Sequence, residues 1–109
     1  MVVIDTTKFK RSENKNWISS KKYDYIKIIF ILNNFGDLTA QQINYYYVKI
    51  FNSRYMDRNR ISALVNQRKD IFQVSTDSNV KEYSFNGSLI LNKTTKHNWL
   101  KKVNKYHNN

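Results

Sequence analysis

The sequence predicts a mainly α-helical domain with one small β-hairpin, and three observations support this fold class. Apolar residues recur at spacings of three and four in four separate segments, as one buried face of a helix requires. Between the third and fourth segments the apolar spacing changes to two, around the turn-forming residues STDSN at 75–79. The chain has 109 residues and no internal repeat or linker, which indicates one domain, 1–109, with one modest core.

The N-terminal segment, about 1–18, is expected to form a basic arm. Its first residues, Val2–Ile4, are candidates for a short strand. Residues 8–15 have no apolar period and indicate a loop or a solvated terminus.

The first helix is predicted between Ser20, a suitable N-cap, and Gly36. The stretch IKIIFIL at 26–32 taken alone suits a buried strand equally well. The length of about 15 residues between cap and glycine favours a helix that ends in a glycine at C′. Its apolar face is formed by Tyr25, Ile28, Ile29, Leu32 and Phe35.

The second helix is predicted from about Ala40 to Phe51. Thr39 followed by Gln42 matches a capping box, and Leu38 with Ile43 matches a hydrophobic staple. The three consecutive tyrosines at 45–47 are either a stacking platform for bases or two core rings with one exposed ring. We favour the core.

The third helix is predicted at 57–69, with Asp57 as its cap. One of its faces is apolar, and the other is rich in hydrogen-bond donors and has no glutamate. Ile61, Leu64, Val65 and the stem of Arg68 form the apolar face. Asn59, Ala63, Asn66 and Asp70 fall opposite, flanked by Arg60, Ser62, Gln67 and Lys69. Asp70 is expected to follow the end of this helix.

A β-hairpin is predicted at 72–85, with its tip at about Thr76–Asn79. Asn86 and Gly87 are then expected to turn the chain. The following residues, SLILN, are either a further strand or the entry to a final helix.

The last helix is predicted at 94–107. Trp99, Leu100, Val103 and Tyr106 form its apolar face, and five lysines and no acid occur from Asn92 onward. This face either closes over the first helix or pairs with a second copy. We expect a homodimer through the C-terminal helix.

The order of these elements resembles the winged helix-turn-helix family. The resemblance is carried by FGDLTAQQI at 35–43, NRISALVNQRKDIF at 59–72 and FQVSTDSNVKEYSF at 72–85. It implies a three-helix core and a two-stranded wing, to which the predicted C-terminal helix is an addition. The connection between the second and third helices is longer than in compact bacterial regulators, and Asp70 replaces the usual glycine before the wing.

The formal charge of +11, from 19 Lys and Arg against 8 Asp and Glu, favours a polyanion. Nucleic acid is the first choice, an anionic membrane surface the second, and solubility alone the alternative. The longest apolar run, IIFIL, is too short to cross a bilayer, and no signal-peptide pattern opens the chain. We therefore expect a cytoplasmic protein whose partner is double-stranded DNA, with no membrane partner.

Enzymatic chemistry is not indicated. The chain has no cysteine and only two glycines, so it has no thiolate metal site and no glycine-rich phosphate loop. His97 and His107 have no acid close by, and the acids are scattered rather than clustered around a metal. We expect no catalytic residue, no metal and no cofactor.

The third helix is the predicted reading element, because Asn and Gln pair with adenine and Arg with guanine in the major groove. The wing and the arm are expected to contact phosphate. The candidate residues are Arg58, Asn59, Arg60, Ser62, Ala63, Asn66, Gln67 and Lys69 on the helix, Ser78, Asn79 and Lys81 on the wing, and Lys8, Lys10 and Arg11 in the arm.

These residues predict a sequence-specific DNA-binding protein, either a small transcriptional regulator or a phage or mobile-element protein. One alternative is a protein-interaction module, for example an inhibitor of a nucleic-acid enzyme. Another is a small basic RNA-binding protein or ribonuclease.

Overall fold

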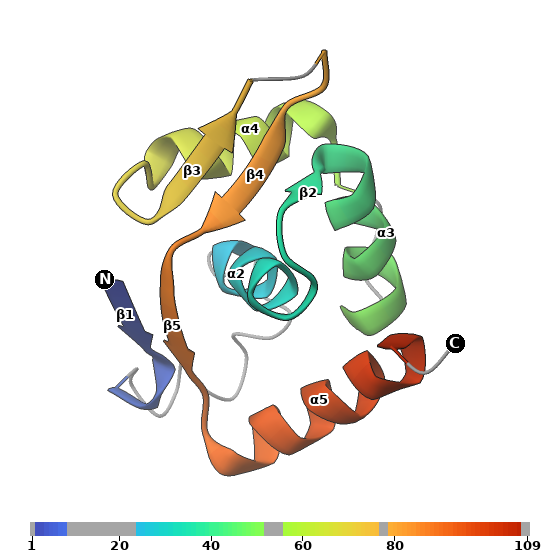
Figure 1. Ribbon diagram of the computed structural model, residues 1–109. Helices are drawn as coiled ribbons and strands as arrows, with labels where there is room; N and C mark the ends of the chain where they lie inside the picture. The colour runs from blue at the N-terminus through green and yellow to red at the C-terminus, as the bar shows by residue number, and fades with distance from the viewer. Residues whose placement is uncertain (1, 9–23, 52–55, 77–78, 108–109) are drawn as a thin grey trace.

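The computed structural model describes residues 2–8, 24–51, 56–76 and 79–107, and the chain in them is mostly helical with a small antiparallel sheet (Figure 1). The four α-helices are α2 (Asp24–Phe35), α3 (Ala40–Phe51), α4 (Arg58–Gln67) and α5 (Lys93–His107), and a 3-10 turn, η1, spans Thr6–Lys8. The strands are β1 (Val2–Asp5), β2 (Leu38–Thr39), β3 (Phe72–Ser75), β4 (Glu82–Phe85) and β5 (Gly87–Ile90). This confirms the predicted fold class at the level of helices and a small sheet.

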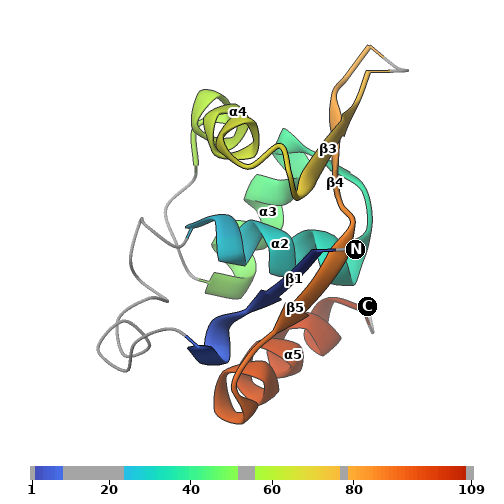
Figure 2. The same cartoon turned by 90° about the vertical axis from the view of Figure 1, so that its left-hand side faces the viewer.

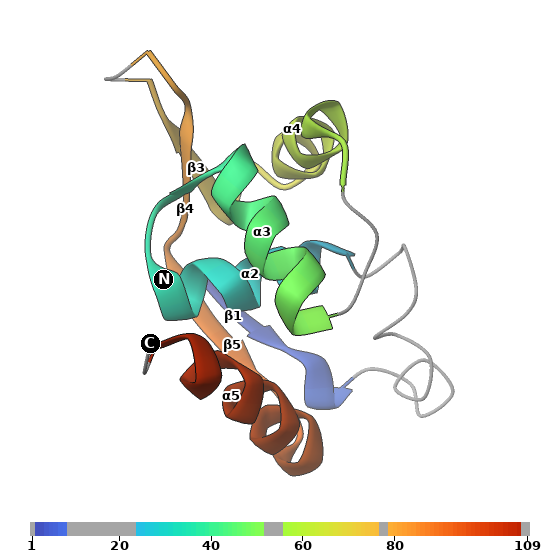
Figure 3. The same ribbon diagram turned by 90° about the vertical axis from the view of Figure 1, so that its right-hand side faces the viewer.

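Helix α2 is the centre of the molecule, with α4 on one side and α5 on the other (Figures 1 and 3). Its residues from Asp24 to Leu32 are all buried except Tyr25, which is half-buried. A helix that is apolar on all sides has to be covered on all sides. The isoleucine-rich run is therefore helical, as its length predicted, and is not a strand.

Two backbone devices end α2 and begin α3. Gly36 has φ +86, and its N–H donates to the Leu32 carbonyl at 3.0 Å, so it closes the helix in a conformation that favours glycine. The Thr39 N–H donates to Gln42 Oε1 at 3.0 Å, and the Gln42 N–H donates to Thr39 Oγ1 at 3.3 Å. The predicted capping box is confirmed.

The antiparallel sheet has three strands in the order β2-β4-β3, so the predicted hairpin gains a third strand. Phe72 pairs with Phe85 and Val74 with Tyr83 in the hairpin, and Leu38 of β2 pairs with Tyr83 on the other side. Through β2, the hairpin is joined to the start of α3.

A second, two-stranded sheet was only partly foreseen. β1 pairs in parallel with β5, Val2 opposite Gly87 and Asp5 opposite Ile90 (Figure 2). The expected turn at Asn86 and Gly87 is wrong, because Gly87 is the first residue of β5 and only Gly36 has a positive φ among the described glycines. SLILN is thus mainly a strand.

The core has two clusters that share partly buried side chains. One joins α2, α3 and α4 to the three-stranded sheet, and the other joins α2 and α3 to α5. Trp99 lies edge-on to Phe30 and Phe51, with ring centroids 4.9 and 4.6 Å apart. Trp99 is 4% exposed and Val103 is 2% exposed.

The structure therefore assigns the apolar face of α5 to the core of its own chain. This was the weaker of the two sequence-based alternatives. The expected homodimer through this face is not supported, because the side chains that would form it are already buried within the chain.

The tyrosines at 45–47 follow the core alternative. Tyr47 is 5% exposed, Tyr46 is half-buried and stacks on Phe35 with centroids 3.8 Å apart, and Tyr45 is 52% exposed. They do not form a shared stacking surface.

Candidate nucleic-acid interface

Helix α4 presents a polar face to solvent because its other face is fully used by the core. Ile61, Leu64 and Val65 are buried in the cluster with α2 and α3. Asn59, Ala63 and Asn66 are exposed on the opposite side, as the helical spacing predicted. Arg58, Gln67 and Lys69 are exposed as well.

Both ends of α4 are fixed by acids. At the start, Asp57 Oδ1 accepts a hydrogen bond from the Asn59 N–H at 2.6 Å, which confirms Asp57 as the cap. At the end, the helix stops at Gln67, two residues earlier than predicted, and the chain turns through 68–71. Asp70 thus lies beyond the helix, as expected.

Arg68, whose stem was predicted on the apolar face, is half-buried and lies just past the end of the helix. Its guanidinium pairs with Asp70, Nε to Oδ1 at 3.2 Å, and lies 5.3 Å from the centre of the Tyr25 ring. The hydrogen bond to Asp70 raises the pKa of Arg68, and the same bond lowers the pKa of the Asp70 carboxyl. The pair neutralises the one acid that would repel phosphate at this end of α4.

Arg60, which was predicted to contact base edges, forms an ion pair within the chain. Its Nη2 lies 3.1 Å from Asp24 Oδ2 and donates to it. The other Asp24 oxygen accepts from the Tyr47 hydroxyl at 2.8 Å and lies 3.8 Å from Lys27 Nζ. Arg60 is thereby directed towards α2 and ties α4 to a buried ionic cluster.

The cluster of Asp24, Lys27, Tyr47 and Arg60 was not predicted as a unit. Asp24 is 5% exposed and Lys27 is 3% exposed. Burial lowers the pKa of Lys27, and the nearby Asp24 charge partly offsets this effect. Lys27 Nζ also lies 5.4 Å from the centre of the Tyr47 ring.

A groove of about 470 Å³ lies where the starts of α3 and α4 approach the hairpin. It brings together five predicted residues from two regions of the sequence: Arg58, Asn59, Ser62, Asn79 and Lys81. It also includes residues that the sequence analysis did not select: Thr39, Ala40, Gln41, Val80 and Tyr83. Spacing within each element does not reveal which elements meet in space, so the start of α3 and the apolar residues of the hairpin were not selected.

A side-chain hydrogen bond connects α4 to the hairpin at the groove. The Ser62 hydroxyl and the Tyr83 hydroxyl are 3.1 Å apart and share a hydrogen bond. Tyr83 is buried and Ser62 is half-buried, so this bond sets the distance between α4 and β4. Ser62 therefore lines the groove, and its hydroxyl is engaged by Tyr83.

Several predicted contacts cannot be placed in this interface. Lys10, Arg11 and Ser78 lie outside the described residues, and for Lys8 only the backbone, in η1, is described. In the described part of the hairpin, Asn79 and Lys81 are exposed next to the start of α4.

Comparison with known proteins adds no relative: no family model, curated protein or solved structure matches this chain. Over the described ranges, no set of three or more His, Cys, Asp or Glu side chains is placed to hold a metal ion. None of the helices described combines the length and the apolar character that crossing a membrane requires.

Proposed function

We propose that the protein binds double-stranded DNA in a sequence-specific manner, with α4 as the helix that enters the major groove. The observation that carries this proposal is the outward face of α4. Asn59, Ala63 and Asn66 are exposed along one side of the helix, with Arg58 at its start and Gln67 at its end. The face contains no acid.

The chemistry of this face suits base edges. Asn and Gln amides pair bidentately with adenine, and the small Ala63 allows close approach to a thymine methyl. A helix about 10–12 Å in diameter enters a major groove about 12 Å wide. An ordinary solvated helix face would not need this combination of amides and small side chains.

The surroundings of α4 suit a duplex as well. The hairpin projects past α4 in Figures 2 and 3, so its exposed Lys81 and Asn79 can reach a phosphate beside the groove that α4 occupies. The order helix, helix, helix, hairpin is the one on which the resemblance to winged helix-turn-helix proteins rests. On this basis the protein is a winged-helix DNA-binding protein acting in the cytoplasm, as a small regulator or a mobile-element protein.

Selection of bound sequences from a random duplex pool tests this proposal. We expect enrichment of one short motif, and a steep linear fall of log affinity with log salt as condensed counterions are released. A pool without enrichment, together with salt-insensitive capture of a protein partner, would instead indicate the protein-interaction alternative.

A further inference from the structure

Among the helices that the structure describes, α5 carries more net positive charge than α4. Helix α5 has five lysines and no acid, so it contributes +5 of the chain's formal +11. Lys93, Lys96, Lys101, Lys102 and Lys105 are all exposed. The span from Asp57 to Phe85, which holds α4 and the hairpin, has five basic and four acidic residues.

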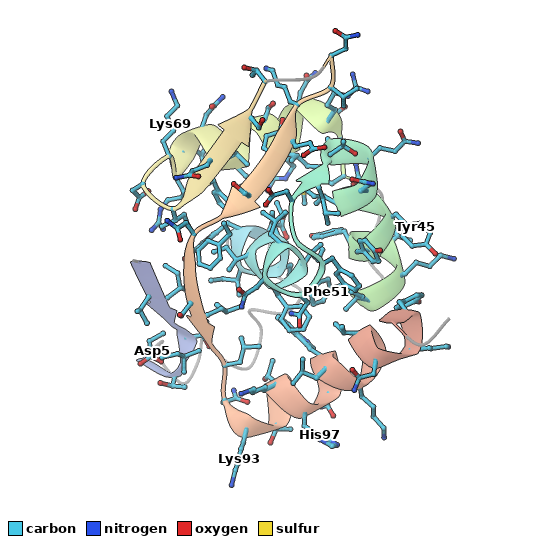
Figure 4. The ribbon with its side chains drawn as sticks, in the orientation of Figure 1. Asp5, Tyr45, Phe51, Lys69, Lys93 and His97 are labelled. Carbon is cyan, nitrogen blue, oxygen red and sulfur yellow. The ribbon has the colours of Figure 1, made fainter. Side chains whose placement is uncertain are left out.

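The two surfaces lie at opposite ends of the molecule. Figures 1 and 3 show α4 and the hairpin on one side of α2, and α5 on the other. In Figure 4, Lys69 points away from the molecule at one end, and Lys93 and His97 point away at the other. A straight duplex seated on α4 therefore cannot reach the outward side of α5.

Three of the lysines lie along one strip of the outward side of α5. Lys93, Lys101 and Lys105 lie at positions spaced by multiples of four residues, and His97 occupies the place between the first two. The strip is about 18 Å long at 1.5 Å per residue, and phosphates of one DNA strand recur about every 3.4 Å. Several phosphates can therefore lie along it.

One acid lies in the strand that pairs with β5. Asp5 is opposite Ile90, just before α5 begins. Its Oδ1 accepts hydrogen bonds from the Thr7 N–H and from the Thr7 hydroxyl. These bonds hold the carboxylate within the β1–η1 turn.

A membrane surface suits α5 less well than a nucleic acid does. A helix that lies on a membrane inserts an exposed apolar face between lipids. The apolar face of α5 is used by the core, because Trp99 and Val103 are buried and Leu100 and Tyr106 are half-buried. The exposed side chains of α5 are polar or charged.

We infer that the lysine strip of α5 is a second nucleic-acid site, which binds the phosphate backbone of duplex DNA without reading its sequence. Together with α4, it enables one molecule to bridge two duplex segments. The bridging rests on the proposed function of α4, whereas phosphate binding by α5 does not. Phosphate contacts of this kind supply affinity and carry no sequence information.

A two-duplex retention assay tests the inference. A random-sequence duplex is fixed to beads, the full-length protein is added, and retention of a second, fluorescent duplex is measured. The key variant is Lys101→Gln with Lys105→Gln, and Lys101→Arg with Lys105→Arg is its charge-preserving control. Lys69→Gln with Lys81→Gln removes the same charge from the α4 end.

We expect the wild-type protein to retain the second duplex and the K101Q/K105Q variant to lose it. The slope of log affinity against log salt should fall in magnitude by about 2 in that variant, near 0.9 for each lost phosphate contact. The K101R/K105R control should keep both properties. Circular dichroism is expected to show that all variants are folded, since all four substituted lysines are exposed.

Two results would overturn the α5 site: an unchanged salt slope in K101Q/K105Q, or pelleting with phosphatidylserine–phosphatidylcholine vesicles without duplex binding. No retention of the second duplex by the wild-type protein would overturn the bridging. The proposed sequence-specific binding by α4 is tested separately, by the selection of bound sequences from the random pool. If selection yields no motif but K101Q/K105Q still weakens duplex binding, the proposed function fails and the α5 site stands.

Discussion

Helices α4 and α5 are packed in the same way but have different outward surfaces. Each buries one apolar face against the helices α2 and α3, and each turns the other face to solvent. The outward face of α4 consists mainly of amides and small side chains, and its arginines at 60 and 68 are paired with Asp24 and Asp70. The outward face of α5 consists mainly of lysines.

The difference separates two properties that net charge alone would combine. Charge attracts any duplex, and its contribution falls as salt rises. Amide donors attract duplexes weakly but distinguish between base pairs. A search for the most basic helix would select α5 as the DNA-reading element, whereas the donor pattern selects α4.

The largest expected effect concerns the inward face of α5. Trp99→Ala should lower the free energy of unfolding by about 3–5 kcal/mol, because it empties a space between Phe30 and Phe51. Urea denaturation measures this loss. Tyr45→Ala removes a half-exposed ring as a control and should cost no more than about 1 kcal/mol.

Equal stability of the Trp99 and Tyr45 variants would show that α5 is not part of the core. If, in addition, sedimentation showed a wild-type dimer and a monomeric Trp99 variant, the apolar face would belong to an interface between copies.

The next effect concerns Arg60. Arg60→Ala should lower the free energy of unfolding by about 1 kcal/mol, because the pair is partly exposed and Asp24 keeps Tyr47 and Lys27 as partners. The preference for a selected duplex over a random one should stay as in the wild type. Arg58→Ala, on the neighbouring exposed position, is the stability control. If Arg60→Ala lost its preference for the selected duplex while its free energy of unfolding stayed unchanged, Arg60 would contact base edges after all.

The smallest effect is a pH dependence from Lys27. Burial in the folded state lowers the pKa of Lys27 below its ordinary value of 10.5. At a pH between the folded-state pKa and 10.5, Lys27 is therefore protonated more often in the unfolded chain than in the folded one. The free energy of unfolding should therefore rise with pH in that window, and the gain is lost as pH falls through the folded-state pKa. In Lys27→Met this contribution is absent. The free energy of unfolding of the wild type should therefore rise relative to that of the variant as pH approaches 10.5. The exposed Lys49→Met is the control, and a parallel pH profile for both variants would contradict the expectation.

Local signals allowed most helices to be predicted from the sequence. The capping box at Thr39 and Gln42, the cap at Asp57 and the glycine at 36 each act within a few residues, so sequence alone reveals them. The periodic apolar faces gave the correct buried sides of α4 and α5 for the same reason.

Long-range contacts could not be predicted in this way. The pairing of β1 with β5 joins residues 2–5 to 87–90, and neither strand exceeds four residues. The direction of Arg60 depends on Asp24, which is 36 positions away. Helical spacing placed Arg60 at the edge of the polar face, but a long side chain at an edge can turn either way. The partner of the Trp99 face was ambiguous because spacing indicates burial without naming the partner.

The candidate site follows the same division. Asn59, Ala63 and Asn66 were correctly placed on the solvent side of α4 from spacing alone. The groove beside them was not foreseen, because it is lined by residues from α3, α4 and the hairpin, which are far apart in the sequence.

The claim that α4 reads sequence while α5 does not is tested most directly by one pair of matched variants. Asn66→Ala and Asn104→Ala each remove an exposed amide, one from α4 and one from α5. The measured quantity is the ratio of affinities for a selected and a random duplex. We predict that Asn66→Ala lowers this ratio by a factor that corresponds to about 1–3 kcal/mol of binding free energy, and that Asn104→Ala leaves the ratio unchanged. An equal loss of affinity of the Asn66 variant for both duplexes would contradict the claim.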